Sequence, residues 1–203
     1  MKKIHIVEIS IAFALVFSVI VSTVSFGAEC KKIRQDVVRL HILANSDSNE
    51  DQNIKLKIRD ALLDCGSEIF AGELNVENAV EVINAEKSVL KELINEILSE
   101  NGFDYKAEIY VEKEFFTTRQ YDSFTLPAGE YLALKIILGN GEGHNWWCVM
   151  FPPLCLPAVT QENDIKYYLG KNGAEIIQNS PKYEVKFKIV EIFETIKCRI
   201  RQN

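Results

Sequence analysis

The segment from Gly139 to Cys155, GNGEGHNWWCVMFPPLC, constrains the fold more than any other part of the chain. It places two tryptophans, two cysteines and two prolines beside a glycine turn. Asn140-Gly141 tolerates the positive φ angles of a tight turn, and the successive prolines stiffen the chain without donating backbone hydrogen bonds. The sequence therefore predicts a rigid hairpin tip here.

Cys148 and Cys155 bracket the two prolines, and we expect them to form a disulfide. Closing this short ring would stabilise the fold by roughly 2.5 kcal/mol in the chain-entropy model, provided that the compartment is oxidising. The chain has five cysteines, which are too few and too widely spaced for a disulfide scaffold. One bridge and a mainly hydrophobic core are therefore expected.

The first 28 residues are predicted to export the chain. Lys2 and Lys3 precede an almost uninterrupted apolar run from Ile9 to Phe26, which is typical of a signal peptide or a transmembrane anchor. The run is long for a cleaved signal and short for a membrane span, and small residues at the −3 and −1 positions favour cleavage before Ala28. A cleaved signal peptide and a retained anchor both remain open.

Residues 29–203 are expected to form a single domain, since about 175 residues suffice for one substantial core. The net charge of −6 at pH 7 does not favour nucleic acid, whose phosphates need clustered Lys and Arg. It does not favour adhesion to an anionic membrane surface either. Membrane contact is thus expected only through the N-terminal segment, if that segment is retained.

Hydrophobic periodicity predicts an α+β fold, in which two or three amphipathic helices pack on an antiparallel or mixed sheet. The strands at 131–138 and 146–151 should form a hairpin near the sheet centre. Gly66 should end the helix that begins near Asp47. The polar segment 157–179 should be a mobile connection with one short helix. The residues from Tyr183 to Ile189 also alternate as a strand would. Strands are expected at 37–43, 105–112, 114–119, 131–138 and 146–151, and helices at about 47–65, 75–99 and 180–200.

Asp47 and Glu50 have the spacing of a capping box at the start of the first helix. The same two carboxyl groups would suit a general acid and base. Capping is the simpler interpretation, because the spacing is what a capped helix requires.

No convincing catalytic or metal-binding pattern is present. His41, His144, Cys148 and Cys155 lack the spacing of a zinc site, and a disulfide explains the cysteines better than a nucleophilic pair of His144 with Cys148. The GNGEG turn lacks the lysine and the following helix of a phosphate-binding loop. We therefore expect no enzymatic activity, no cofactor and no metal.

Trp146 and Trp147 are adjacent, so in a strand they face opposite sides of the sheet. We expect one of them to enter the core and the other to be exposed near the turn. An exposed tryptophan can be a hot spot for a protein partner or a platform for a sugar ring.

Two segments closely resemble the stage II sporulation protein R family of endospore-forming bacteria. They are RLHILANSDSNEDQNIKLKIRDALL at 39–63 and LPAGEYLALKIILGNGEGHNWWCVMFPPLCLP at 126–157. The resemblance implies a protein made in the forespore and exported into the space between forespore and mother cell. There it would activate a membrane-embedded aspartic protease of the mother-cell septal membrane, which processes pro-sigma-E. This implied role is signalling by binding.

The surface that contacts the protease is expected to combine the NSDS loop with the hairpin tip, held rigid by the 148–155 bridge. Its residues are Asn45, Ser46, Asp47, Ser48, Asn140, Gly141, Asn145, Trp146 and Trp147. The alternative is a cell-envelope protein that binds or hydrolyses peptidoglycan, with Asp47 or Glu50 acting on the bond and a tryptophan stacking on the sugar.

Overall fold

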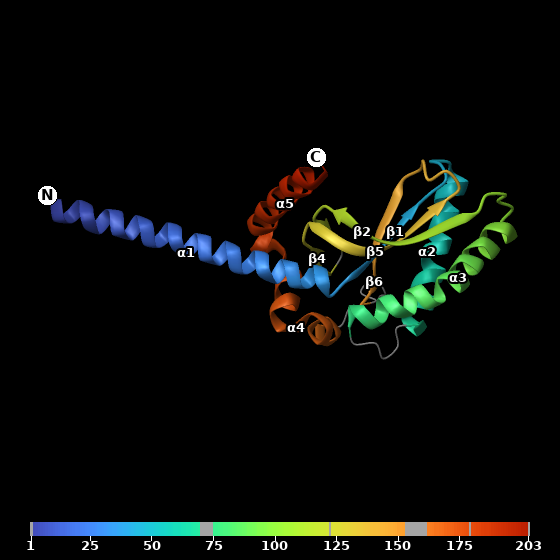
Figure 1. Ribbon diagram of the computed structural model, residues 1–203, viewed down its shortest axis with the longest axis horizontal. Coiled ribbons are helices and arrows are strands. Elements are labelled where there is room, and N and C mark those ends of the chain that lie inside the picture. Colours follow the sequence, from blue (N-terminus) through green and yellow to red (C-terminus); the bar gives the residue numbers. More distant parts are fainter. Residues whose placement is uncertain (1, 70–74, 122, 153–161, 179, 203) are drawn as a thin grey trace.

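A mixed sheet lies at the centre of the molecule, with helices on both faces (Figure 1). The computed structural model describes residues 2–69, 75–121, 123–152, 162–178 and 180–202. The α+β class predicted from the sequence is confirmed. The helices are α1 (Lys2–Gln35), α2 (Asn49–Ile69), α3 (Val76–Glu100), α4 (Glu162–Gln178) and α5 (Ser180–Gln202). The strands are β1 (Val38–Leu43), β2 (Ala107–Phe116), β3 (Arg119–Gln120), β4 (Thr125–Leu126), β5 (Gly129–Leu138) and β6 (Asn145–Phe151).

The four long strands are ordered β2-β5-β1-β6. β1 pairs with β5 in parallel and with β6 in antiparallel orientation, and β2 pairs with β5 in antiparallel orientation. The predicted hairpin of β5 and β6 is wrong, because β1 lies between these two strands. The turn signal after β5 is local, whereas the insertion of β1 depends on contacts with residues about a hundred positions away.

α2 and α3 cover one face of the sheet. Their apolar stripes pack on the inward residues of β1, β2 and β5, with Ile58, Ile94, Leu40 and Ile136 among the fully buried side chains. Asn75 caps α3 by accepting the N–H of Asn78, and α3 ends at Asn101-Gly102, close to the end predicted at residue 99. The core therefore follows the helical and alternating periodicities of the sequence.

The other face is covered by α4, α5 and the last turns of α1. Phe26 is buried against Tyr183 and Phe187 of α5, with ring centroids 5.5 and 5.2 Å apart. Arg34 of α1 donates to Glu194 of α5 at 3.0 Å and to the carbonyl of Ala128 at 3.0 Å. These contacts join the end of α1 to the domain, whereas its first two thirds project away from it (Figure 1).

α1 has the length and composition to cross a membrane, with a mean hydropathy of 2.3 over its most apolar window. The helix continues past the predicted boundary at residue 28 as far as Gln35. The export segment and the first element of the domain are therefore one continuous helix.

Three other predicted boundaries differ from the structure. Gly66 does not stop α2, which continues to Ile69. β2 continues to Phe116, so the separate strand predicted at 114–119 is reduced to the short β3. Residues 162–178 are helical with a break at Gly170 (φ 69°), in place of a mobile connection with one short helix. The helix predicted at about 180–200 is confirmed over residues 180–202, and the alternative strand at 183–189 is not formed. Part of the predicted mobile connection, at 157–161, lies outside the described residues.

Candidate functional site

Two loops meet at the edge of the sheet where β1 and β5 end. Because these strands are parallel, their carboxyl ends emerge side by side and lead into residues 44–48 and 139–144. The N–H of Glu142 donates to the carbonyl of Asn45 at 3.2 Å, and the N–H of Gly143 donates to that of Ala44 at 2.9 Å. The two segments predicted to share a surface are therefore in contact. Residues 45–48 and 140–147 are called the loop surface below.

Asn45 and Asp47 hold the tip between β5 and β6 through their side chains. Oδ1 of Asn45 accepts the N–H of Asn140 at 3.0 Å. Oδ1 of Asp47 accepts the N–H of His144 at 2.6 Å and is also in contact with Nδ1 of His144. The side-chain and backbone hydrogen bonds from His144 lower the pKa of Asp47. Asp47 is therefore held as a carboxylate at the solvent-exposed rim.

Asp51 is a buried carboxylate beneath this rim, and the sequence analysis did not identify it. It accepts Ser46 Oγ at 2.5 Å, Asn45 Nδ2 at 2.9 Å and Tyr105 Oη at 2.5 Å. Burial on its own would raise the pKa of Asp51, but these hydrogen bonds outweigh it and the pKa is lowered. The side chain of Asp51 thus fixes the NSDS loop from below.

The cap of α2 is one residue later than predicted. Ser48 caps the helix, because the N–H of Asp51 donates to its Oγ at 3.1 Å. The Ser48-x-x-Asp51 spacing was the signal in the sequence that could have identified both residues. Asp47 does not cap α2, which leaves its carboxylate to bind His144, and Glu50 is exposed in the first turn of the helix.

Lys55 holds the tip from the side of α2. Its ammonium group is buried and donates to the carbonyl of His144 at 2.7 Å and to Oε1 of Gln52 at 2.6 Å. Burial lowers the pKa of Lys55, against the raising effect of the Asp47 carboxylate. Lys55 thereby places a positive charge under a loop that carries Asp47.

Two of the glycines lie so close to the NSDS loop that there is no room for a side chain. A Cβ on Gly143 would lie 2.1 Å from the carbonyl oxygen of Ser46, and one on Gly139 would lie 2.2 Å from Oδ1 of Asn45. Gly139 also has φ of 57°. Gly141 has the positive φ predicted for it (67°), whereas Asn140 does not. Any larger residue at position 143 would separate the two loops.

The tryptophans face opposite sides of the sheet, as predicted, but neither is widely exposed. Trp146 packs against the core under α2, with the Arg59 guanidinium 4.4 Å from its ring centre. Trp147 stacks on His41 at 5.2 Å and has the Arg119 guanidinium 3.9 Å from its ring centre. Each ring is half-buried beside a cation.

The exposed part of the loop surface is polar. The side chain of His144 is 79% exposed. Asn45, Ser46 and Gly141, which were predicted as contact residues, are only partly exposed and act instead as its support. The exposed side chains are those of Asp47, Ser48, Asn140, Glu142, His144 and Asn145.

Comparison with known proteins gives one family and one relative. The model of the family described as stage II sporulation protein R matches residues 34–161. The chain belongs to the stage II sporulation protein R family. Stage II sporulation protein R of Bacillus subtilis (strain 168) is 38% identical over 143 residues, which are 70% of this chain and 64% of that protein. No solved structure matches.

The region that matches stage II sporulation protein R contains the whole loop surface, the sheet, α2 and α3. Most of α1, together with α4 and α5, lies outside it. The family match therefore covers the part of the chain in which the two loops meet.

Arg39 is a second residue of this family member that the sequence analysis did not single out. It is fully buried, with its guanidinium 4.4 Å from the ring centre of Phe116 and 5.1 Å from that of Tyr131. It donates to the carbonyl of Cys148 at 3.1 Å and to Tyr121 Oη at 2.6 Å. Arg39 therefore ties β6 to the segment that follows β3.

The predicted disulfide includes Cys155, which lies outside the described residues, so the bridge stays a prediction. Cys148 is buried on β6. Within the part of the chain that the structure describes, no three His, Cys, Asp or Glu side chains are grouped as metal ligands would be.

Proposed function

We propose that this chain is an exported signal of sporulation that activates a membrane-embedded aspartic protease in the mother-cell septal membrane, which leads to the processing of pro-sigma-E. It acts by binding and catalyses no reaction. Membership of the stage II sporulation protein R family supports the sporulation role. The loop surface is the contacting region in this proposal.

The position of the loop surface is the observation that carries this proposal. β1 follows directly after α1, and its far end leads into the NSDS loop. Six residues of strand span about 20 Å. Figure 1 shows the loops that follow β1 and β5 at the opposite end of the sheet from the point where α1 enters. A chain anchored through α1 in the forespore membrane would thus present these loops toward the facing membrane.

The loop surface is also organised before any partner binds. Its two loops are joined by backbone hydrogen bonds and by the side chains of Asn45, Asp47 and Lys55. A rigid surface loses little conformational entropy on binding. A ligand shifts a receptor only through contacts that differ between the inactive and active states, and a fixed polar surface suits that requirement.

α1 is a retained anchor in this proposal. Phe26 precedes the expected cleavage point before Ala28, yet it is buried in the core beneath α5. Removing it would expose the rings of Tyr183 and Phe187. The chain would thus stay in the forespore membrane with its domain in the intermembrane space.

Reconstitution in a non-sporulating host tests the proposal. The chain, the septal aspartic protease and pro-sigma-E are co-expressed, and cleavage of pro-sigma-E is followed by immunoblot. We expect cleavage only when all three are present, and a loss of cleavage with Asn145→Ala. Asn84→Ala, at an exposed position on α3, is the matched control. Cleavage that is independent of the chain would reject the proposal.

A role in binding peptidoglycan is the alternative, and the tryptophans bear on it. Trp147 is stacked on His41 and accompanied by Arg119, so a sugar ring would have to displace a guanidinium to stack there. Sedimentation of the purified chain with peptidoglycan, together with analysis of released fragments, distinguishes the two roles. Retention or release that is lost with Asp47→Asn would favour the alternative.

A further inference from the structure

A stripe of exposed apolar side chains runs along α5. Its successive members are one, three or four residues apart, at positions that fall on one side of a helix. Val185 is 74% exposed, Phe193 64% and Ile200 70%. A contiguous apolar surface of this kind marks an interaction site in a folded protein. The α5 stripe consists of Val185, Ile189, Ile192, Phe193, Ile196 and Ile200.

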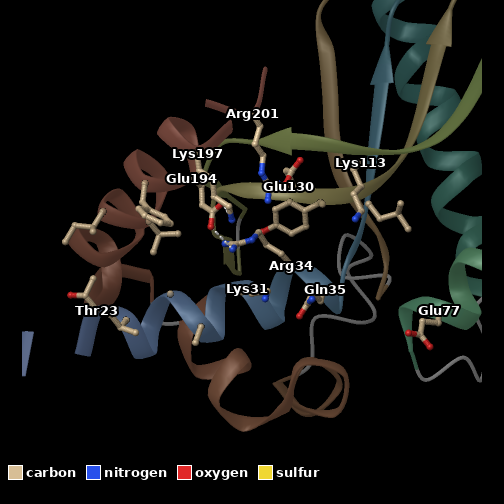
Figure 2. A pocket seen from close by; sticks show the side chains of 18 residues that line it. Thr23, Lys31, Arg34, Gln35, Glu77, Lys113, Glu130, Glu194, Lys197 and Arg201 are labelled. Atoms are coloured by element: carbon tan, nitrogen blue, oxygen red, sulfur yellow. Dashed lines mark hydrogen bonds and ion pairs between the residues drawn. The ribbon is translucent and has the colours of Figure 1, made fainter. Parts of the chain in front are cut away.

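The α5 stripe is continuous with the apolar surface of α1. Nζ of Lys186 donates to Oγ of Ser22 at 2.8 Å where the two helices meet. A hollow of about 1060 Å³ lies between α1, α5 and the sheet, and Val24 of α1 lines it together with Ile189 and Phe193 of α5. Figure 2 shows Thr23 of α1 on one side of this hollow and α5 with Glu194 and Lys197 on the other.

α5 meets α1 at the level where the apolar span ends. The apolar side chains of α1 are exposed from Ile6 to Val24, and burial in the domain begins at Phe26. A bilayer core of about 30 Å takes up about 20 helical residues, so a span that begins at Ile6 ends near Ser25. Figure 1 shows α5 crossing this part of α1, with the bare part of α1 extending beyond it. α5 therefore lies at the height of the lipid headgroups.

The charge of α5 suits an anionic lipid surface. The chain as a whole has a net charge of −6, but α5 is basic. Basic side chains beside an apolar stripe are typical of helices that lie in the interface of an anionic membrane. The basic residues of α5 are Lys182, Lys186, Lys188, Lys197, Arg199 and Arg201, and the acidic residues are Glu184, Glu191 and Glu194.

We propose that α5 lies on the anionic phospholipid bilayer that α1 spans, with the α5 stripe inserted at the interface. Two helices that enter the membrane surface at different angles fix the orientation of a domain better than a single anchor. The sheet is then held with the loop surface directed away from the lipid. Membrane contact in this proposal includes α5, whereas the sequence predicted it only for the N-terminal segment.

Photocrosslinking of the full chain in vesicles tests this inference. The chain is reconstituted in phosphatidylcholine vesicles with and without phosphatidylglycerol, both containing a phospholipid with a photoactivatable acyl chain. Labelled residues are mapped by mass spectrometry. We expect labels on the α5 stripe as well as on α1, and more labels on α5 when phosphatidylglycerol is present. Combined Ile192→Ser, Phe193→Ser and Ile196→Ser substitutions should remove the α5 labels, whereas Val89→Ser on α3 should not.

Labels confined to α1 would overturn the inference, because they would show α5 away from the lipid. An unlabelled α5 in vesicles where an amine crosslinker joins two chains would also overturn it and would assign the α5 stripe to a second copy. Near-UV circular dichroism checks that the triple variant is folded. If it is not, the comparison of wild-type labels between the two lipid compositions decides the question. This inference rests on the proposed retention of α1, but activation of the protease plays no part in its readout, so it can fail while the proposed signalling role stands.

Discussion

Asp47 and His144 are 97 residues apart in the chain, and the Asp47 carboxylate accepts the backbone N–H of His144 at 2.6 Å. The imidazole of His144 contacts the same oxygen. This interaction joins the loop after β1 to the loop after β5, which are the two segments expected to form the contact surface. Both side chains remain exposed, so the residues that fix the surface also belong to it.

Asp47→Ala should therefore strongly reduce signalling while leaving the fold intact. The substitution removes the acceptor that positions His144. It also removes a negative charge from the exposed rim. We expect cleavage of pro-sigma-E in the reconstituted system to fall by about an order of magnitude, as for truncation of an interface hot spot. Glu81→Ala, at an exposed position on α3, is the control. Full cleavage with Asp47→Ala, at equal levels of protein, would exclude Asp47 from the contact.

Asp51→Ala should destabilise the fold, because it leaves the hydroxyl groups of Ser46 and Tyr105 without their acceptor. We expect the free energy of unfolding to fall by about 2 to 3 kcal/mol, measured by urea denaturation. Asp60→Ala on the same helix removes an exposed carboxylate and should leave the free energy of unfolding almost unchanged. Equal effects of the two substitutions would show that the hydrogen bonds of Asp51 contribute little.

The contribution of Asp51 should also depend on pH. Hydrogen bonds hold its pKa in the folded protein below the usual value of 3.8. The unfolded chain therefore binds a proton more readily than the folded one as the pH falls. The stabilisation is complete above the unfolded pKa and is lost as the pH falls through the lower, folded pKa. The difference in melting temperature between wild type and Asp51→Asn should be constant near neutral pH and narrow in acid. A difference in melting temperature that widens in acid would contradict a lowered pKa of Asp51 in the folded protein.

Local patterns in the sequence predicted individual elements well. Asn75 and Asn101-Gly102 delimit α3 because capping depends on neighbouring residues only. The apolar run from Tyr131 to Leu138 identified β5 for the same reason, since a short apolar run bounded by turn residues is typical of a buried strand. These elements needed no knowledge of the rest of the chain.

Pairing and polar contacts between distant segments were not predictable in the same way. Two apolar runs on either side of a glycine turn fit a hairpin as well as the observed order with β1 between β5 and β6, because an apolar run indicates burial and not the neighbouring strand. Asp47 has the sequence spacing of a cap for α2, but Ser48 caps the helix instead. The reason is visible only in the structure, where the Asp47 carboxylate is bound to His144 in the loop after β5. The meeting of the two loops was inferred from the resemblance, whereas the buried support by Asp51 and Lys55 required the structure.

The burial of Phe26 leads to a prediction about the fate of α1. Cleavage before Ala28 would cut a continuous helix and remove a ring that stacks on Tyr183 and packs edge-to-face against Phe187, which favours a chain that stays intact. Intact-mass spectrometry of the exported chain, purified from host membranes, should give the mass of the uncleaved protein. Phe26→Ala should lower the free energy of unfolding by about 3 kcal/mol, since it removes a buried aromatic ring. A soluble product that begins at Ala28 and is as stable as the full chain would show that the domain does not need this ring and that export ends in release.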